Sequence, residues 1–142
     1  MVPRKGARAS ASVPAPVTSA TPRAVTFEVA GRPVGKERPR VAGGHAYTPQ
    51  RTRSYAKAVA VAALSAGVHA TGPVALTCWI FSEDRRTGDG DNVVKAILDA
   101  LVKAGCLPGD TLAHVPMGCW RWGGVDPVRP RVVVTVEPMG GG

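Results

Sequence analysis

The chain has 142 residues, and its 18 lysines and arginines against 10 aspartates and glutamates give it a formal net charge of +8. This length predicts a single domain, and the positive charge favours a polyanionic partner, either nucleic acid or an anionic membrane face. No apolar run reaches the ~18 residues that a membrane-spanning helix needs, so nucleic acid is the favoured partner and no membrane association is expected.

The first half of the chain predicts, in order, a tail, a strand, a loop and a helix. Residues 1–24 are rich in alanine, serine and proline and contain no acid, which is typical of a disordered basic extension. Residues 25–30 alternate between apolar and polar side chains and predict a strand. Proline, glycine and basic residues fill positions 32–54, where we expect a long loop. Alanine-rich residues 52–69 predict a helix that ends before a Gly-Pro pair at 72–73.

The second half predicts one more helix among further strands. Residues 73–82 predict a buried strand, and residues 83–90 predict a loop. The following helix is expected over 91–104, because Asp91 is a good N-cap and Gly105 stands where a C′ glycine belongs. The apolar residues of this helix fall at i, i+3, i+4 and i+7 and form one buried stripe, at Val94, Ile97, Leu98 and Leu101.

Two more strands are expected near the end of the chain, over 113–122 and 130–138. The resulting order, β-α-β-α-β-β, is that of a small single α+β domain with a mixed β-sheet and two main helices. We therefore expect one domain over 25–138, preceded by the tail 1–24 and followed by a flexible glycine-rich end at 139–142.

The three cysteines, Cys78, Cys106 and Cys119, form no CxxC pair. Their odd number disfavours a disulfide framework and fits a reducing compartment. The spacing of Cys106, His114 and Cys119 matches no common zinc module, so ordinary buried or surface roles are favoured for these residues.

Six of the ten acids lie close together in the sequence, at Glu83, Asp84, Asp89, Asp91, Asp99 and Asp110. In the run "DGD", Asp89 and Asp91 would point to the same side of an extended backbone, and Gly90 would permit an unusual backbone conformation. Two converging carboxylates repel each other unless a cation lies between them, and Mg²⁺ or Mn²⁺ suits such a pair. The alternative, equally open, is that Asp91 caps the helix and Asp89 lies in a polar turn.

Three charged residues that follow this pair, Lys95, Asp99 and Asp110, are interpreted in relation to it. Lys95 lies one helical turn after Asp91, which would bring its ammonium near a phosphate held by the metal. Alternatively, Lys95 is an exposed lysine paired with Asp99, which is itself expected to be structural because it lies four residues from both Lys95 and Lys103. Asp110 would join the same site if the chain doubles back after the helix.

Together, the motifs "GDGDNVVKAILDALVKAG…GD" and "GRPVGKERPRV…AYTPQRT" resemble those of the RusA-type Holliday-junction resolvases, which are crossover-junction endodeoxyribonucleases. The resemblance spans roughly residues 25–138. It implies that Asp89, Asp91 and Asp110 hold Mg²⁺, with Mn²⁺ as a possible substitute, and that Lys95 and these carboxylates are catalytic. Some members have two adjacent aspartates where this chain has Gly109-Asp110.

The same resemblance implies a homodimer, whose twofold symmetry places one site at each of two opposed strands. It also implies four-way junction DNA as the substrate, a role in recombination and repair, and a cytoplasmic protein encoded by a bacterium or a phage. Two alternatives stay open. One is a non-catalytic DNA-binding relative of the family. The other is a nucleotide- or sugar-phosphate enzyme that holds Mn²⁺ with an Asp-x-Asp pair, which leaves the basic loop unexplained.

Basic residues in and just after the long loop are expected to face DNA, because so many like charges with few acids nearby are not typical of a merely solvated loop. The set is Arg32, Lys36, Arg38, Arg40, Arg51, Arg53 and Lys57. Tyr47, Trp120 and Trp122 could stack on bases, although packing in the core or the sheet is an equally good expectation for each of them.

Overall fold

The structure, a computed structural model, describes residues 23–37, 40–85 and 88–139. The predicted tail therefore lies, except for its last two residues, outside the described residues, and so does Arg38. The elements follow in the order β1 (Val25–Ala30), β2 (Arg40–Ala42), β3 (His45–Tyr47), α1 (Gln50–Ala66), β4 (Val74–Ser82), α2 (Gly90–Lys103), β5 (Met117–Val125) and β6 (Arg131–Pro138). No helix in the described part of the chain is long and apolar enough to cross a membrane.

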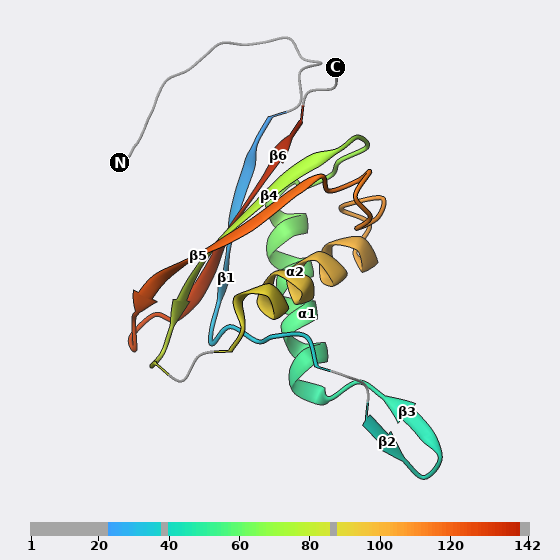
Figure 1. Ribbon diagram of the computed structural model, residues 1–142, viewed down its shortest axis with the longest axis vertical. Coiled ribbons are helices and arrows are strands. Elements are labelled where there is room, and N and C mark those ends of the chain that lie inside the picture. Colours follow the sequence, from blue (N-terminus) through green and yellow to red (C-terminus); the bar gives the residue numbers. More distant parts are fainter. Residues whose placement is uncertain (1–22, 38–39, 86–87, 140–142) are drawn as a thin grey trace.

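Four strands form one mixed sheet in the order β1-β6-β4-β5, and both helices cover the same face of it (Figure 1). Strands β4 and β5 are parallel and are joined through α2, while β6 is antiparallel to both β1 and β4. The predicted α+β domain with a mixed sheet and two main helices is confirmed. The topology places the start of α2 at the end of β4, beside the parallel strand β5.

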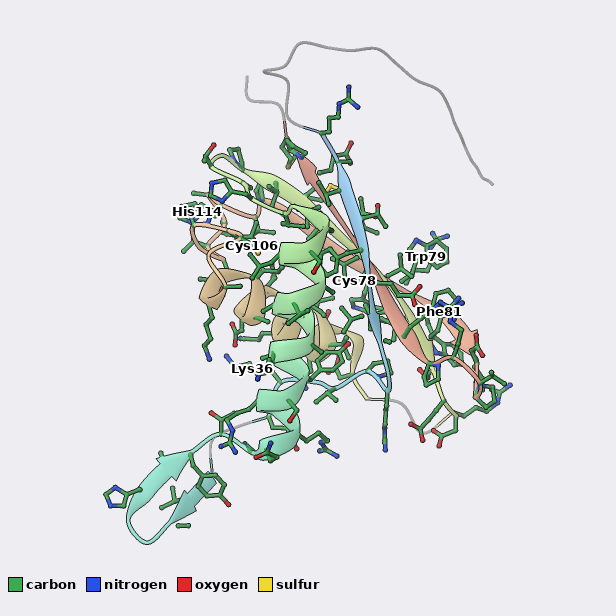
Figure 2. All side chains as sticks on the ribbon, turned by 180° about the vertical axis from the view of Figure 1, so that it is seen from behind. Lys36, Cys78, Trp79, Phe81, Cys106 and His114 are labelled. Atoms are coloured by element: carbon green, nitrogen blue, oxygen red, sulfur yellow. The ribbon has the colours of Figure 1, made fainter. Side chains whose placement is uncertain are left out.

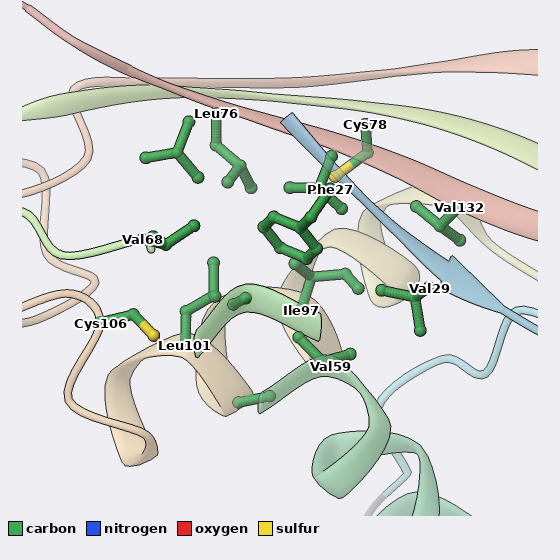
Figure 3. Packing of buried hydrophobic residues seen from close by; sticks show 14 of the residues in the cluster. Phe27, Val29, Val59, Val68, Leu76, Cys78, Ile97, Leu101, Cys106 and Val132 are labelled. Carbon is green, nitrogen blue, oxygen red and sulfur yellow. The ribbon is translucent and has the colours of Figure 1, made fainter. Parts of the chain in front are cut away.

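The core lies between the sheet and the two helices (Figure 3). Alternate residues of β6 point toward the helices, so Val132, Val134 and Val136 are buried between solvent-accessible neighbours. From α2, Ile97 and Leu101 are fully buried as predicted. The predicted partners Val94 and Leu98 are only partly buried, and the small residues Ala96 and Ala100 take more of the contact. The stripe is displaced because α2 packs against α1 as well as against the sheet.

The region expected to be one long loop contains a separate hairpin, which projects beyond the start of α1 (Figure 1). Strands β2 and β3 pair antiparallel and are joined by Gly43 and Gly44, with φ of 59° and 81°. Two consecutive residues with positive φ form a tight hairpin turn, and two glycines make this possible without strain. The predicted uninterrupted loop is therefore wrong.

The limits of α1 also differ from the prediction. The helix begins at Gln50 and ends at Ala66, because Gly67 adopts a left-handed conformation with φ 84°. The N–H of Gly67 lies near the carbonyl oxygens of Ala63 and Leu64, which satisfies the last turn. The stop therefore comes at a C-cap glycine, earlier than the Gly-Pro pair from which it was predicted.

Helix α2 begins with a different cap from the one expected. The Asp89 carboxylate accepts a hydrogen bond from the Asp91 N–H at 2.9 Å, so Asp89 is the N-cap and Asp91 lies in the first turn. At the other end, Gly105 follows the helix with φ 81°, as predicted for a C′ glycine. Strand β5 starts at Met117, later than expected, because the N–H groups of His114 and Val115 both bond to the Thr111 carbonyl in a turn.

The three cysteines differ in exposure, and this gives a first testable prediction. Cys78 and Cys106 are buried and Cys119 is exposed. Burial, with a smaller contribution from Cys119, raises the pKa of the Cys78 thiol to about 12, and burial also raises the pKa of Cys106. Because the thiolate is the reactive form, we expect iodoacetamide at pH 8 to modify Cys119 in the native protein and to spare the other two. Peptide mass spectrometry measures this, and equal labelling of Cys78 and Cys119 would contradict the packing described.

Candidate active site at the start of helix α2

Two carboxylates, two residues apart in the chain, lie where α2 begins. Asp89 has an extended backbone and caps the helix, and Asp91 follows in its first turn. The Asp91 Oδ1 atom accepts a hydrogen bond from the indole Nε1 of Trp120 at 2.9 Å. Both aspartates are exposed, so their carboxylates are accessible from solvent. The pair therefore lies at a helix start, and the extended backbone expected for the "DGD" run is present only at Asp89.

Gly90, between the two aspartates, has a role that the sequence did not indicate. It lies inside the helix, and a Cβ atom added there would come within 2.4 Å of Cδ2 and Cε2 of Trp120. The indole ring thus lies directly against the glycine backbone. Position 90 therefore requires glycine because it has no side chain, and not because of its backbone freedom. The absence of a side chain leaves space for the indole ring, which allows Trp120 to reach Asp91.

Replacing Gly90 tests this close approach. Gly90→Ala should displace Trp120 and break its bond to Asp91, although alanine favours a helix by about 1 kcal/mol over glycine. We expect the near-UV circular dichroism spectrum of the tryptophans to change. We also expect the melting temperature not to rise, although helix propensity alone predicts that alanine would raise it. Gly88→Ala is the matched control, because a Cβ atom there meets nothing within 4 Å. An unchanged spectrum in Gly90→Ala would contradict the assigned contact.

A cleft of about 420 Å³ opens beside Asp89. It lies between the segment 32–37, the end of β4, the start of α2 and the middle of β5. Its apolar lining consists of Pro33, Val34, Ile80, Val93, Trp120 and Trp122. The indole N–H of Trp122 bonds to the Ser82 hydroxyl at 3.1 Å. Trp120 and Trp122 are 43% and 44% exposed, so neither is a core residue.

Lys95 and Asp99 lie farther along α2, and they do not form the ion pair with each other that was one of the two expectations. Lys95 is exposed, one turn beyond Asp91. Asp99 forms an ion pair with Lys36, with Nζ and Oδ2 at 2.7 Å, and among the described residues no ion pair engages Lys95. Asp99 is thus structural, as predicted, but its partner comes from the loop after β1. The ammonium of Lys95 is left available to a ligand at the start of α2.

Asp110 does not join the other two carboxylates in this chain. It borders a second cavity, of about 360 Å³, with Asp99 and Lys103, whereas Asp89 borders the first. Helix α2 has 14 residues, so its two ends lie about 20 Å apart at the usual rise per residue. Within the described residues, no group of three histidine, cysteine, aspartate or glutamate side chains could hold a metal ion, which also applies to Cys106, His114 and Cys119.

The residue before Asp110 is a glycine for a steric reason. A Cβ atom at Gly109 would lie 2.5 Å from Nδ1 of His114, which also contacts the Thr111 hydroxyl at 3.0 Å. The imidazole therefore fills the space that a second aspartate would need. This explains locally why one acid stands where some members of the resembled family have two.

Folding brings carboxylates to the basic residues that were expected to face DNA. Arg32 lies 3.6 Å from Glu83, and Arg51 lies 2.6 Å from Glu37, while Lys36 is paired with Asp99. Few acids lie near these residues in the sequence, but the fold adds Glu83 and Asp99 from distant parts of the chain.

The rest of the predicted set is placed as follows. Arg53 bonds to Gln50 and to the Thr48 carbonyl, at 2.6 and 2.8 Å, and Lys57 is exposed on α1. Arg40 begins β2, and Tyr47 is an exposed residue of the hairpin, remote from the core. None of these contacts involves the two carboxylates at the start of α2.

Sequence reasoning missed two features of the site, the indole bond to Asp91 and the cleft itself. Trp120 and Asp91 are 29 residues apart, so no local pattern connects them. The spacing of Trp120 and Trp122 did carry a usable signal, because residues i and i+2 of a strand share one face.

A comparison with protein-family models finds one that matches residues 30–137 and is described as endodeoxyribonuclease RusA. The matched span includes Asp89, Asp91, Lys95 and Asp110, together with the whole cleft. Among curated proteins, no match to the chain was found.

Proposed function

Because this chain belongs to the RusA endodeoxyribonuclease family, we propose that it is a Mg²⁺-dependent endonuclease that resolves four-way DNA junctions in recombination and repair. The single observation that carries the proposal is the family match, which covers residues 30–137. The accessible carboxylate pair at the start of α2 and the net charge of +8 support it. We place its action in the cytoplasm of a bacterium, whether a bacterial or a phage gene encodes it.

The donor set at the start of α2 fits a hard cation. Asp89 and Asp91 each use Oδ1 in a hydrogen bond, and no bond or ion pair within the described residues engages either Oδ2 atom. Mg²⁺ is usually held by one or two carboxylates and completes its shell with waters and substrate phosphate. We propose that these two residues hold Mg²⁺, for which Mn²⁺ can substitute. When bound, such an ion neutralises charge on the phosphate and activates water for attack.

Two neighbouring residues of the chain would assist without holding the ion. The Trp120 N–H fixes one oxygen of Asp91, which orients the other oxygen outward, as outer-shell donors commonly do. Lys95 is exposed one turn farther along α2. Its flexible stem would bring the ammonium to the phosphate, where negative charge grows during attack.

The position of Asp110 supports a homodimer. Asp89 and Asp91 lie at the start of α2, whereas Asp110 follows the other end of this helix. Within the described residues, one chain therefore brings only two of the three expected carboxylates to a site. In a twofold dimer, contacts between the copies are reciprocal. We propose that Asp110 of one copy completes the carboxylate set of the other, which would make the two sites interdependent and suit them to two opposed strands.

The basic residues near the cleft would contact DNA only in competition with their own carboxylates. Arg32, Lys36 and Arg51 are each within 3.6 Å of one. A DNA phosphate then has to displace these carboxylates or bind the cation together with them. The affinity for DNA should therefore be sensitive to salt. Arg53 and Lys57, which have no carboxylate partner among the described residues, would add contacts from α1.

The test is cleavage of a synthetic four-way junction and of a duplex with the same arm sequence, each with Mg²⁺ and with EDTA. We expect cuts only in the junction and only with Mg²⁺. Junction binding without cuts under any metal condition would favour the second candidate, a non-catalytic DNA-binding relative. Failure to bind DNA at all would leave only the third, a phosphate-processing enzyme with a small substrate.

A further inference from the structure

We propose that the cleft beside Asp89 binds one unstacked nucleobase of the DNA strand whose phosphate lies at the aspartates. The inference rests on the proposed function for its substrate, DNA, and adds a binding site to it. A junction contains bases near its branch point that can leave the stack at low cost, and enzymes that act on nucleic acids often hold such bases in aromatic pockets.

The size and lining of the cleft suit a base. Its volume of about 420 Å³ falls within the usual range of small-ligand sites, which are largely apolar with a few polar groups. Pro33 and Val34, which follow β1, and the indoles of Trp120 and Trp122 on β5 all contribute apolar surface to it. A flat aromatic ligand buried among these side chains would gain apolar and stacking contacts.

The two indoles are presented together by the fold. Trp120 is in register with Cys78 and Trp122 with Ile80, and both of these β4 residues are buried against the helices. Both tryptophans therefore lie on the helix-covered face of the sheet. Trp120 contacts Gly90, the first residue of α2. The Ser82 hydroxyl accepts the Trp122 N–H at 3.1 Å and so holds that ring by its edge. Edge attachment leaves the face of the ring available for stacking.

The charges around the cleft favour a neutral occupant over a phosphate. Among the described residues, three cations line it, Arg32, Lys36 and Arg51, and so do four carboxylates, Glu37, Glu83, Asp84 and Asp89. A phosphate inside would meet this acidic excess, whereas the amino groups of a base edge could donate to it. Asn92, also in the lining, offers both a donor and an acceptor. Asp89, an exposed residue of the lining, then keeps the phosphate next to the proposed metal.

The third tryptophan provides a matched control. Trp79 is 39% exposed, close to the 44% of Trp122, but it lies on the opposite face of the sheet (Figure 2). There the Arg121 guanidinium covers it at 5.1 Å from the ring centroid. Trp79 borders neither of the two cavities described above.

The experiment is a binding cycle between protein and DNA, in EDTA so that no strand is cut. An abasic nucleotide is placed in turn at each position around the branch point of a fixed four-way junction. For the wild type, we expect one position in each of the two opposed strands at which losing the base weakens binding about tenfold, as for a lost base–aromatic stack. In Trp122→Ala, the intact junction should bind about tenfold more weakly and the same abasic position should have no further effect.

Two further variants make the result decisive. Trp122→Phe keeps an aromatic face and should retain the dependence on the base, whereas Trp79→Ala should behave as the wild type. If the abasic loss is undiminished in Trp122→Ala, or if no position matters in the wild type, the base site is wrong. Neither result bears on cleavage, so the proposed function fails separately, through absence of Mg²⁺-dependent cuts in the intact junction.

Discussion

Asp89→Asn and Asp91→Asn are each expected to abolish junction cleavage while leaving junction binding intact or slightly tighter. Losing a residue that merely supports a metal ligand costs about 10- to 100-fold, so losing a ligand itself should cost at least about 100-fold in the cleavage rate. Binding should survive, because removing a negative charge lowers repulsion toward phosphates. The measurements are single-turnover cleavage with saturating protein, and junction affinity in EDTA.

These substitutions leave the local fold with its hydrogen bonds. Asparagine caps a helix about as well as aspartate, and the amide oxygen at position 91 can still accept the Trp120 N–H. Glu137→Gln is the matched control, since it removes one exposed carboxylate from the end of β6. We expect that variant to cut normally. Near-normal cutting by Asp89→Asn would show that the start of α2 is not the site of metal binding.

The second large effect is expected from mixing two inactive variants. Homodimers of Asp91→Asn and of Asp110→Asn should both be inactive. If each site combines Asp89 and Asp91 of one copy with Asp110 of the other, a mixed dimer contains one site with all its carboxylates and one site with both changes. We expect it to regain at least about 100-fold in cleavage over either homodimer, and to nick one strand rather than cut two.

The mixed dimer is obtained by co-expressing the two variants with different affinity tags and purifying through both. Its rate is compared with that of each homodimer on the same junction. A mixed dimer as inactive as both parents would place all the ligands within one chain. Normal cutting by the Asp110→Asn homodimer would remove Asp110 from the site altogether.

The parts of the fold that could be predicted are those governed by local patterns. The apolar spacing of α2, its C′ glycine Gly105 and the alternation in β1 and β6 all depend on residues a few positions apart. Where two local signals competed, the nearer one decided the structure: Gly67 ended α1 before the Gly-Pro pair was reached. The hairpin β2-β3 was missed because its strands have only three residues each, and the side chains described for residues 41–42 and 45–47 are all exposed.

The candidate site was only partly predictable, because its contacts join distant segments. The sequence drew attention to Asp89 and Asp91 through their spacing. It could not indicate that Trp120 packs against Gly90 and bonds to Asp91. It also could not indicate that Asp99 pairs with Lys36 from the loop after β1, and not with a lysine of α2. It also left open whether the chain returns Asp110 to the start of α2. That question depends on the direction of the chain after Gly105, where the turn at Thr111 leads into β5 instead.

Metal-dependent paired cutting is tested most directly with a supercoiled plasmid that extrudes a cruciform. The single measurement is the form of the plasmid after incubation with the wild-type protein and Mg²⁺. Two coordinated cuts across the cruciform base convert it to linear DNA, and we expect linear DNA with Mg²⁺ and none with EDTA or with Asp89→Asn. A plasmid that stays supercoiled under all of these conditions, or that accumulates only as nicked circles, would contradict a dimeric junction resolvase.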